Sequence, residues 1–182
     1  MKIIVAILII LVPLVRVVGQ NREDLPLHIA LGKVVNDLRK QQVDTIYTYY
    51  RYCSGCDSGR DEKPECEGFL EARVVWQSKG KALYQSVDCN GSISLGKPVE
   101  SKALSYFIAN RQAITQRKPL PKGQFYPALA AHFEAEEFTL IVKDKAFRTI
   151  LTEEQREDKM WDRFSWIKPT RQLAKLNQKE KE

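Results

Sequence analysis

The side chains best suited to metal binding, redox chemistry or cross-linking are the four cysteines, Cys53, Cys56, Cys66 and Cys89. Their C-x2-C-x9-C-x22-C spacing permits a zinc site, a redox-active C-x-x-C pair or disulfide bonds. A zinc ribbon needs a second close pair, which Cys89 cannot supply. A thioredoxin-type pair opens a helix, whereas CSGC is followed by DSGRDEKPE, a composition typical of a loop. The sequence therefore favours disulfides, with zinc binding and redox chemistry as the alternatives.

The first twenty residues, MKIIVAILIILVPLVRVVGQ, indicate whether the cysteines meet an oxidising compartment. Lys2 precedes an apolar run at positions 3–15, which is typical of a secretory signal peptide. A membrane-spanning helix needs roughly 20 apolar residues, and Arg16 interrupts this run. We predict a signal peptide at 1–19 with cleavage before Gln20, an uncleaved anchor being the alternative. A secreted, extracellular protein forms its disulfides in an oxidising compartment.

Three predicted β-strands, at 44–52, 69–77 and 81–89, position the cysteines. The first is rich in Thr, Tyr and Ile, which favour strands, and the second alternates between apolar and polar residues. SKGK between the last two predicts a hairpin in which Gly80 takes a positive φ. An antiparallel meander of these strands gathers the cysteines at one end of the sheet. Of the three possible pairings, we expect Cys56–Cys66 and Cys53–Cys89.

The strand at 69–77 alternates between an apolar and a polar face, and its apolar face needs another element to cover it. Leu70, Ala72, Val74 and Trp76 share one face, and Glu71, Arg73 and Gln77 share the other. A preceding helix within 25–42, capped by Asp24, carries apolar residues at helical spacing. Those residues are Leu27, Ala30, Leu31, Val34, Val35 and Leu38. We expect this apolar helix face to pack on the sheet.

The second half of the chain repeats a helix followed by a hairpin. An amphipathic helix is predicted between 96 and 118, and a hairpin at 138–151 turns at 143–145. Thr152 and Gln155 form a capping-box pattern for a short helix. The helix between 96 and 118 carries Val99, Ala103, Leu104, Phe107, Ile108 and Ile114, and the short one carries Met160, Trp161 and Phe164. A single domain then covers 20–168, followed by a polar, mobile tail at 169–182.

The predicted fold class is α+β, with amphipathic helices packed on an antiparallel sheet. A helix followed by an antiparallel meander resembles the cystatin layout in element order over about the first ninety residues. The inhibitory cystatin hairpin motif Q-x-V-x-G is absent, because QQVDT and QSVDC both lack the glycine. The resemblance therefore implies a layout, and it transfers no functional residue.

No catalytic constellation is present, so we predict no enzyme, no cofactor and no metal. The two histidines, His28 and His132, have no nucleophile motif beside them. The acidic runs 134–137 and 153–158 lack EF-hand spacing, and acidic residues at a helix start complement its dipole.

The remaining candidates concern binding. Ligand-binding candidates are Tyr47, Tyr49, Trp76, Phe107 and Trp161, aromatic residues that also suit a core. Asn90 in NGS is a candidate glycosylation site. The formal charge of +6 falls to roughly +4 after signal cleavage, and the basic stretch 111–122 has no stacking aromatics to suggest nucleic acid. We expect a monomeric, disulfide-stabilised binding protein, a protein-interaction or inhibitor module with an extracellular protein partner, or alternatively a carrier of a small apolar ligand.

Overall fold

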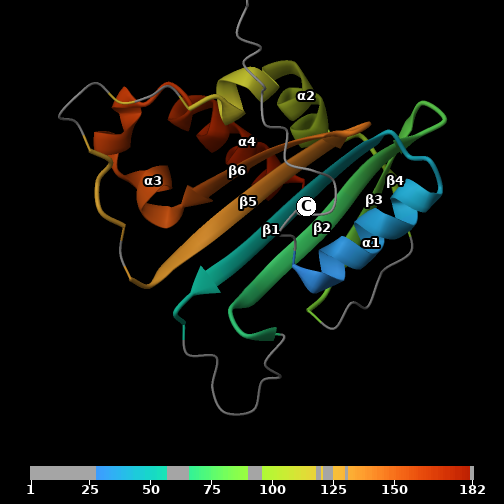
Figure 1. The fold of residues 1–182 in the computed structure, drawn as a ribbon, viewed down its shortest axis with the longest axis horizontal. Helices are drawn as coiled ribbons and strands as arrows, with labels where there is room; N and C mark the ends of the chain where they lie inside the picture. The colour runs from blue at the N-terminus through green and yellow to red at the C-terminus, as the bar shows by residue number, and fades with distance from the viewer. Residues whose placement is uncertain are drawn as a thin grey trace, which may run out of the picture.

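The computed structural model describes residues 28–56, 66–89, 96–117, 120, 125–129 and 131–180. Within these ranges, six strands form one antiparallel sheet in the order β4-β3-β2-β1-β5-β6 (Figure 1). The strands are β1 (Thr45–Ser54), β2 (Phe69–Ser78), β3 (Lys81–Val87), β4 (Lys97–Val99), β5 (Phe133–Val142) and β6 (Lys145–Thr152). The predicted meander is β1-β2-β3, and the α+β fold class is confirmed.

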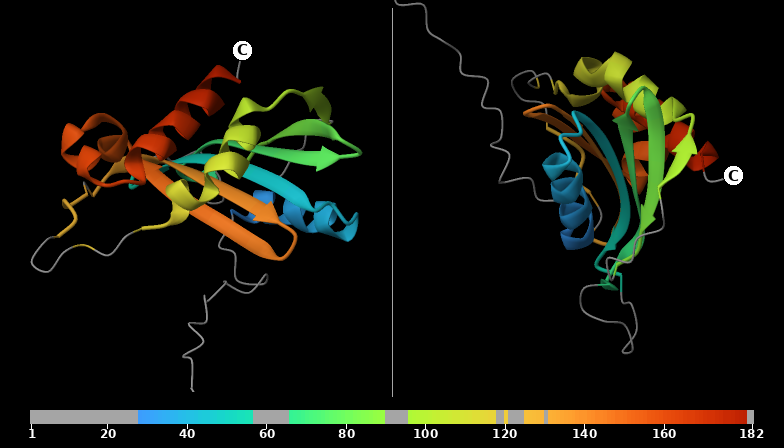
Figure 2. Two further views of the ribbon diagram at one scale, coloured as in Figure 1. Left: turned by 90° about the horizontal axis from the view of Figure 1, so that it is seen from above. Right: turned by 90° about the vertical axis from the view of Figure 1, so that its right-hand side faces the viewer.

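Helices cover both faces of the sheet. The helices of the described residues are α1 (Ile29–Lys40), α2 (Lys102–Thr115), α3 (Glu153–Glu157) and α4 (Ile167–Lys179), with a 3-10 helix η3 (Lys159–Arg163). Figure 2 shows α1 on one face and α2 with α4 on the other. The sheet is therefore the middle layer of three, and an apolar core lies on each side of it.

The core beneath α1 matches the predicted helix–sheet contact. Leu31, Val34 and Leu38 of α1 are buried against Val74 and Trp76 of β2. Leu70 was predicted to join them, but it is 42% exposed. The pairing of β1 with β2 shifts between Arg51 and Tyr52, and Phe69 packs against this core instead. Such a shift in register changes which side chain faces the helix.

The predicted cap of the first helix is wrong. The N-cap of α1 is His28, whose Nδ1 accepts a hydrogen bond from the Ala30 N–H at 3.3 Å. The His28 ring also packs against Tyr50 and Phe69, so tertiary contacts fix where the helix begins. Asp24, the predicted cap, lies outside the described residues.

Both predicted hairpins are confirmed. Lys79 and Gly80 have φ values of 50° and 76°, the left-handed pair that a two-residue turn needs to match strand twist. Lys143 (φ 53°) opens the corresponding turn between β5 and β6. Thr152 and Gln155 form the predicted capping box, although the helix that follows is split into α3 and η3.

The predicted mobile tail at 169–182 is wrong, because α4 occupies most of it. Its face toward α2 and the sheet is buried and consists of Ile167, Thr170, Leu173, Ala174 and Asn177. The Glu180 carboxylate, just beyond α4, accepts a hydrogen bond from the Ala103 N–H at 2.8 Å. A carboxylate at this position satisfies an unpaired N–H at the start of α2.

Candidate functional site

Two disulfides, Cys53–Cys56 and Cys66–Cys89, replace the predicted pairing. Oxidation of all four cysteines was expected, but Cys53–Cys89 and Cys56–Cys66 were the wrong partners. The reason is strand order: Cys53 lies on β1, Cys89 follows β3, and β2 runs between them. Two strand spacings amount to about 9.5 Å, beyond the roughly 7 Å that a disulfide bridges between Cα atoms. The observed pairs have Cα–Cα distances of 5.6 and 5.0 Å.

Both disulfides lie at one end of the sheet, as the meander predicted. There β1 ends, β2 begins and β3 ends, and β5 begins beside the end of β1. We call this the stapled end, defined by residues 53–56, 66–68, 88–89, 131–134 and 153–158. In Figure 1 it is the lower left of the molecule.

His132, which sequence reasoning treated as a lone histidine, belongs to the stapled end. Its Nδ1 contacts the backbone oxygen of Gly55, the residue just before Cys56. The ring is so close that a Cβ on Gly55 would lie 2.6 Å from Nδ1. His132 therefore connects the segment before β5 to the loop that the Cys53–Cys56 bond closes.

An open cleft of about 460 Å³ adjoins this contact. Its lining residues are His132, Phe133, Glu153, Glu154, Glu157 and Asp158. Four of these six residues are carboxylates, in a chain whose formal charge is +6. Within the described residues, no three His, Cys, Asp or Glu side chains converge as metal ligands.

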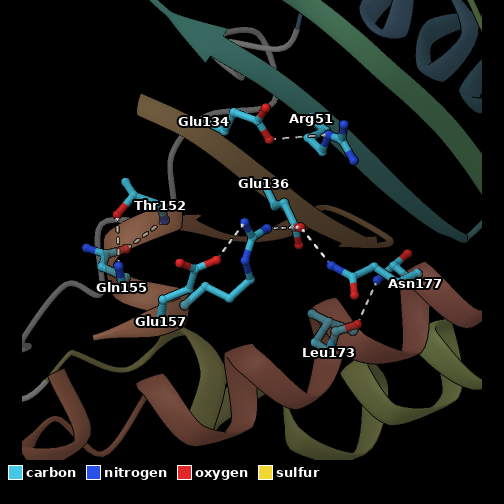
Figure 3. A network of polar contacts seen from close by, with 10 residues as sticks. Arg51, Glu134, Glu136, Thr152, Gln155, Glu157, Leu173 and Asn177 are labelled. Carbon is cyan, nitrogen blue, oxygen red and sulfur yellow. Dashed lines mark hydrogen bonds and ion pairs between the residues drawn. The ribbon is translucent and has the colours of Figure 1, made fainter. Parts of the chain in front are cut away.

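A buried polar cluster lies between the sheet and the helices α3 and α4, and Figure 3 shows it from close by. Glu136 of β5 accepts a hydrogen bond from Arg156 at 2.9 Å and from Gln178 at 3.4 Å. Burial raises the pKa of the Glu136 carboxyl, and the positive charge of Arg156 opposes that shift. Glu134 lies 3.8 Å from Arg51 on the neighbouring strand. Glu136 therefore joins β5 to both C-terminal helices.

A second polar contact ties α4 to the strands. Arg73 of β2 is buried; it pairs with Glu71 at 2.5 Å and donates to the Asn177 backbone oxygen at 3.1 Å. The Asn177 side chain donates to the Tyr47 hydroxyl at 2.6 Å. Burial raises the pKa of this hydroxyl well above its ordinary value. These groups are enclosed and paired with one another, so the arrangement holds α4 on the sheet.

The five predicted ligand-binding aromatics do not share one site. Tyr47, Tyr49, Phe107 and Trp161 are buried in the core under α2 and α4, where Tyr47 packs edge-on against Phe107. Trp76 lies in the other core, under α1. Besides the acidic cleft, open clefts occur beside Ser101 and along α2, and none of the three is lined by any of these aromatics. The predicted glycosylation site, Asn90, lies outside the described residues.

Sequence reasoning missed the buried charges and the acidic cleft. For Arg73 a signal was present, because it lies between Ala72 and Val74 in a predicted strand, whereas Glu136 lies in the acidic run 134–137 and gave none. The cleft left no such signal, because Phe133 and Glu157 are far apart in the chain and come together only across the β5–β6 hairpin.

The fold and the stapled end define an α+β protein with a helix-covered antiparallel sheet and disulfides at one end. No protein-family model, curated protein or solved structure matches this chain. Among the helices of the described residues, none has the length and apolar character needed to cross a membrane.

Proposed function

We propose that this protein is a secreted, non-catalytic binding protein that recognises a protein partner through its stapled end. The observation that carries the proposal is the cross-linking of strand ends at one end of the sheet. The two disulfides and the His132–Gly55 contact join residues 53–56, 66, 89 and 132 beside an open cleft. A surface that is cross-linked before binding loses less conformational entropy when a partner docks.

The chemistry of the cleft indicates a basic partner segment. Glu153, Glu157 and Asp158 are exposed at its rim, and complementary charge speeds association and excludes like-charged competitors. Phe133 adds a half-buried aromatic surface beside the carboxylates. A Lys- or Arg-bearing segment with an apolar neighbour would satisfy both features.

Secretion is part of the proposal, and it rests on the N-terminal signal pattern and on the oxidised cysteines. N-terminal sequencing of protein collected from the medium of expressing cells should read from Gln20. Recovery of residues 1–19 in a membrane fraction would contradict secretion.

The partner is tested by co-purification from the extracellular fluid of the source tissue, with two charge-reversal variants. Glu157→Lys changes the acidic cleft, whereas Glu100→Lys changes an exposed carboxylate at the opposite end of the sheet. We expect one polypeptide to bind the wild type and Glu100→Lys, and to lose about tenfold or more in affinity for Glu157→Lys. Equal binding to both variants would exclude the cleft as the binding site of the partner. A co-purifying lipid without a polypeptide would favour the alternative, a carrier of small apolar ligands.

A further inference from the structure

The two sulfur atoms of the Cys53–Cys56 bond have different surroundings. Cys53 is only 9% exposed, whereas Cys56 is an exposed residue just past the end of β1. Cys66 and Cys89, the partners of the other bond, are both of intermediate exposure. Because a thiolate must reach a disulfide sulfur to attack it, access favours Cys56.

The backbone of Cys53 is fixed independently of its disulfide. Its N–H donates to the Gly68 carbonyl at 2.7 Å, and Cys53 pairs with Glu134 of β5 on its other side. Gly68, at φ +67°, is so close that a Cβ there would lie 2.2 Å from the Cys53 oxygen. Opening the disulfide would therefore leave Cys53 in place and release the exposed Cys56.

The two bonds also differ in what they join. Cys66–Cys89 connects the start of β2 to the end of β3 across 23 positions of sequence. Cys53–Cys56 spans three positions at the end of a single strand. Since the short bond does not link one strand to another, its cleavage removes no connection between the described strands.

We propose that Cys53–Cys56 is a thiol–disulfide exchange site at which Cys56 is the sulfur attacked. The co-reactant is a thiolate of a second molecule. It forms a bond to Cys56 Sγ, the Cys53–Cys56 bond breaks, and Cys53 leaves as a thiolate that takes up a proton from water. The product is a mixed disulfide between Cys56 and the second molecule.

Cys53 can reverse this step, because its sulfur stays beside Cys56. When Cys53 attacks Cys56, the intramolecular bond re-forms and the second molecule departs as a thiolate. If the second molecule is a dithiol, its other thiol can attack its own sulfur instead. The dithiol then leaves as a disulfide, and both Cys53 and Cys56 are reduced, a balanced transfer of two electrons. This exchange does not depend on the proposed partner-binding function.

Graded reduction of the full chain tests the difference between the two bonds. Samples are equilibrated with increasing dithiothreitol, alkylated with iodoacetamide and mapped by peptide mass spectrometry. We expect Cys53 and Cys56 to be alkylated at about tenfold less dithiothreitol than Cys66 and Cys89. Simultaneous opening of both bonds, or earlier opening of Cys66–Cys89, would overturn the proposal.

Two matched variants test which sulfur reacts. Cys53→Ser and Cys56→Ser both remove the same bond, and they leave a thiol at Cys56 and at Cys53 respectively. With oxidised glutathione as the probe, we expect the Cys53→Ser variant to form its adduct about tenfold faster or more. Peptide mapping checks that Cys66–Cys89 stays intact in both. In this assay the remaining cysteine attacks glutathione, so the rates measure how accessible each sulfur is to a second molecule. Equal rates, or faster reaction at Cys53, would show that Cys56 is not the more accessible sulfur and would overturn the proposal.

Discussion

At the residue scale, Glu136 is a buried carboxylate that links strand β5 to the helices α3 and α4. It is 1% exposed, yet it receives hydrogen bonds from Arg156 of α3 and Gln178 of α4. Burial raises the pKa of its carboxyl, and the nearby Arg156 charge reduces the shift without cancelling it. Desolvation thus outweighs pairing, as is common for buried ion pairs.

The raised pKa predicts how Glu136 affects stability with pH. The folded protein holds this proton more tightly than the unfolded chain, whose carboxyl has its ordinary pKa of about 4.3. The contribution of Glu136 to the unfolding free energy is therefore greatest below that value and declines as the pH rises through the folded pKa. Glu136→Gln removes the decline, so the unfolding free energy at pH 7 minus that at pH 4 should be more positive than in the wild type.

Urea unfolding at the two pH values measures that difference. The control is Glu157→Gln, which removes an exposed carboxylate from the same region. In this control, we expect the difference in unfolding free energy between pH 7 and pH 4 to stay within about 0.5 kcal/mol of the wild-type difference. The same pH dependence in Glu136→Gln and wild type would show that the pKa of Glu136 is not raised in the folded protein.

At the element scale, α4 is an integral part of the core rather than an appendage. Leu173 is fully buried, Asn177 holds the Tyr47 hydroxyl, and Glu180 caps the start of α2. Leu173→Ala should lower the unfolding free energy by about 2–5 kcal/mol, because it removes buried methyl groups and leaves a cavity. Lys175→Ala, on the exposed face of the same helix, should change it by less than about 0.5 kcal/mol. Denaturant titration of both variants checks the prediction, and equal effects would show that α4 does not pack as described.

The helix on the opposite face supplies a second element-scale prediction. Val34 of α1 is 4% exposed and packs with Leu31 and Val74. Val34→Asp would bury a charge without a partner and should cost roughly 3 kcal/mol or more. Asn36→Asp adds the same charge on the exposed side of α1. We expect secretion yield to fall sharply for the first variant only, and comparable yields would contradict the contact between α1 and the sheet.

At the scale of the whole molecule, the two disulfides should contribute unequally to stability. The chain-entropy relation gives about 3 kcal/mol for closing the longer Cys66–Cys89 loop and about 2 kcal/mol for Cys53–Cys56. Replacing both members of one pair with serine, in separate double variants, isolates each contribution by urea unfolding. A larger loss from the Cys53–Cys56 variant would mean that the short bond does more than close its loop.

Local sequence patterns predicted much of the secondary structure of this protein. Period-two and helical patterns located the β1-β2-β3 meander, α1, α2 and the β5–β6 hairpin, but Val99, which was predicted in the second helix, lies in β4. Gly80 and Thr152 marked a turn and a helix start. The sequence also predicted that the cysteines gather at one end and are oxidised. These features depend on backbone preferences and side-chain alternation, which act between near neighbours in the chain.

The pairing of the cysteines and the role of the C-terminal segment depend on tertiary contacts, which local patterns do not reveal. The pairing depends on which strands are adjacent, and β2 separates Cys53 from Cys89. The buried face of residues 167–177 includes the polar residues Thr170 and Asn177. Because of these two residues, the segment resembles a polar tail when only its sequence is considered. Asn177 is buried because Tyr47, 130 positions earlier in the chain, accepts its hydrogen bond. A polar residue can enter a core when such a partner is present, and the chain has to fold to supply one.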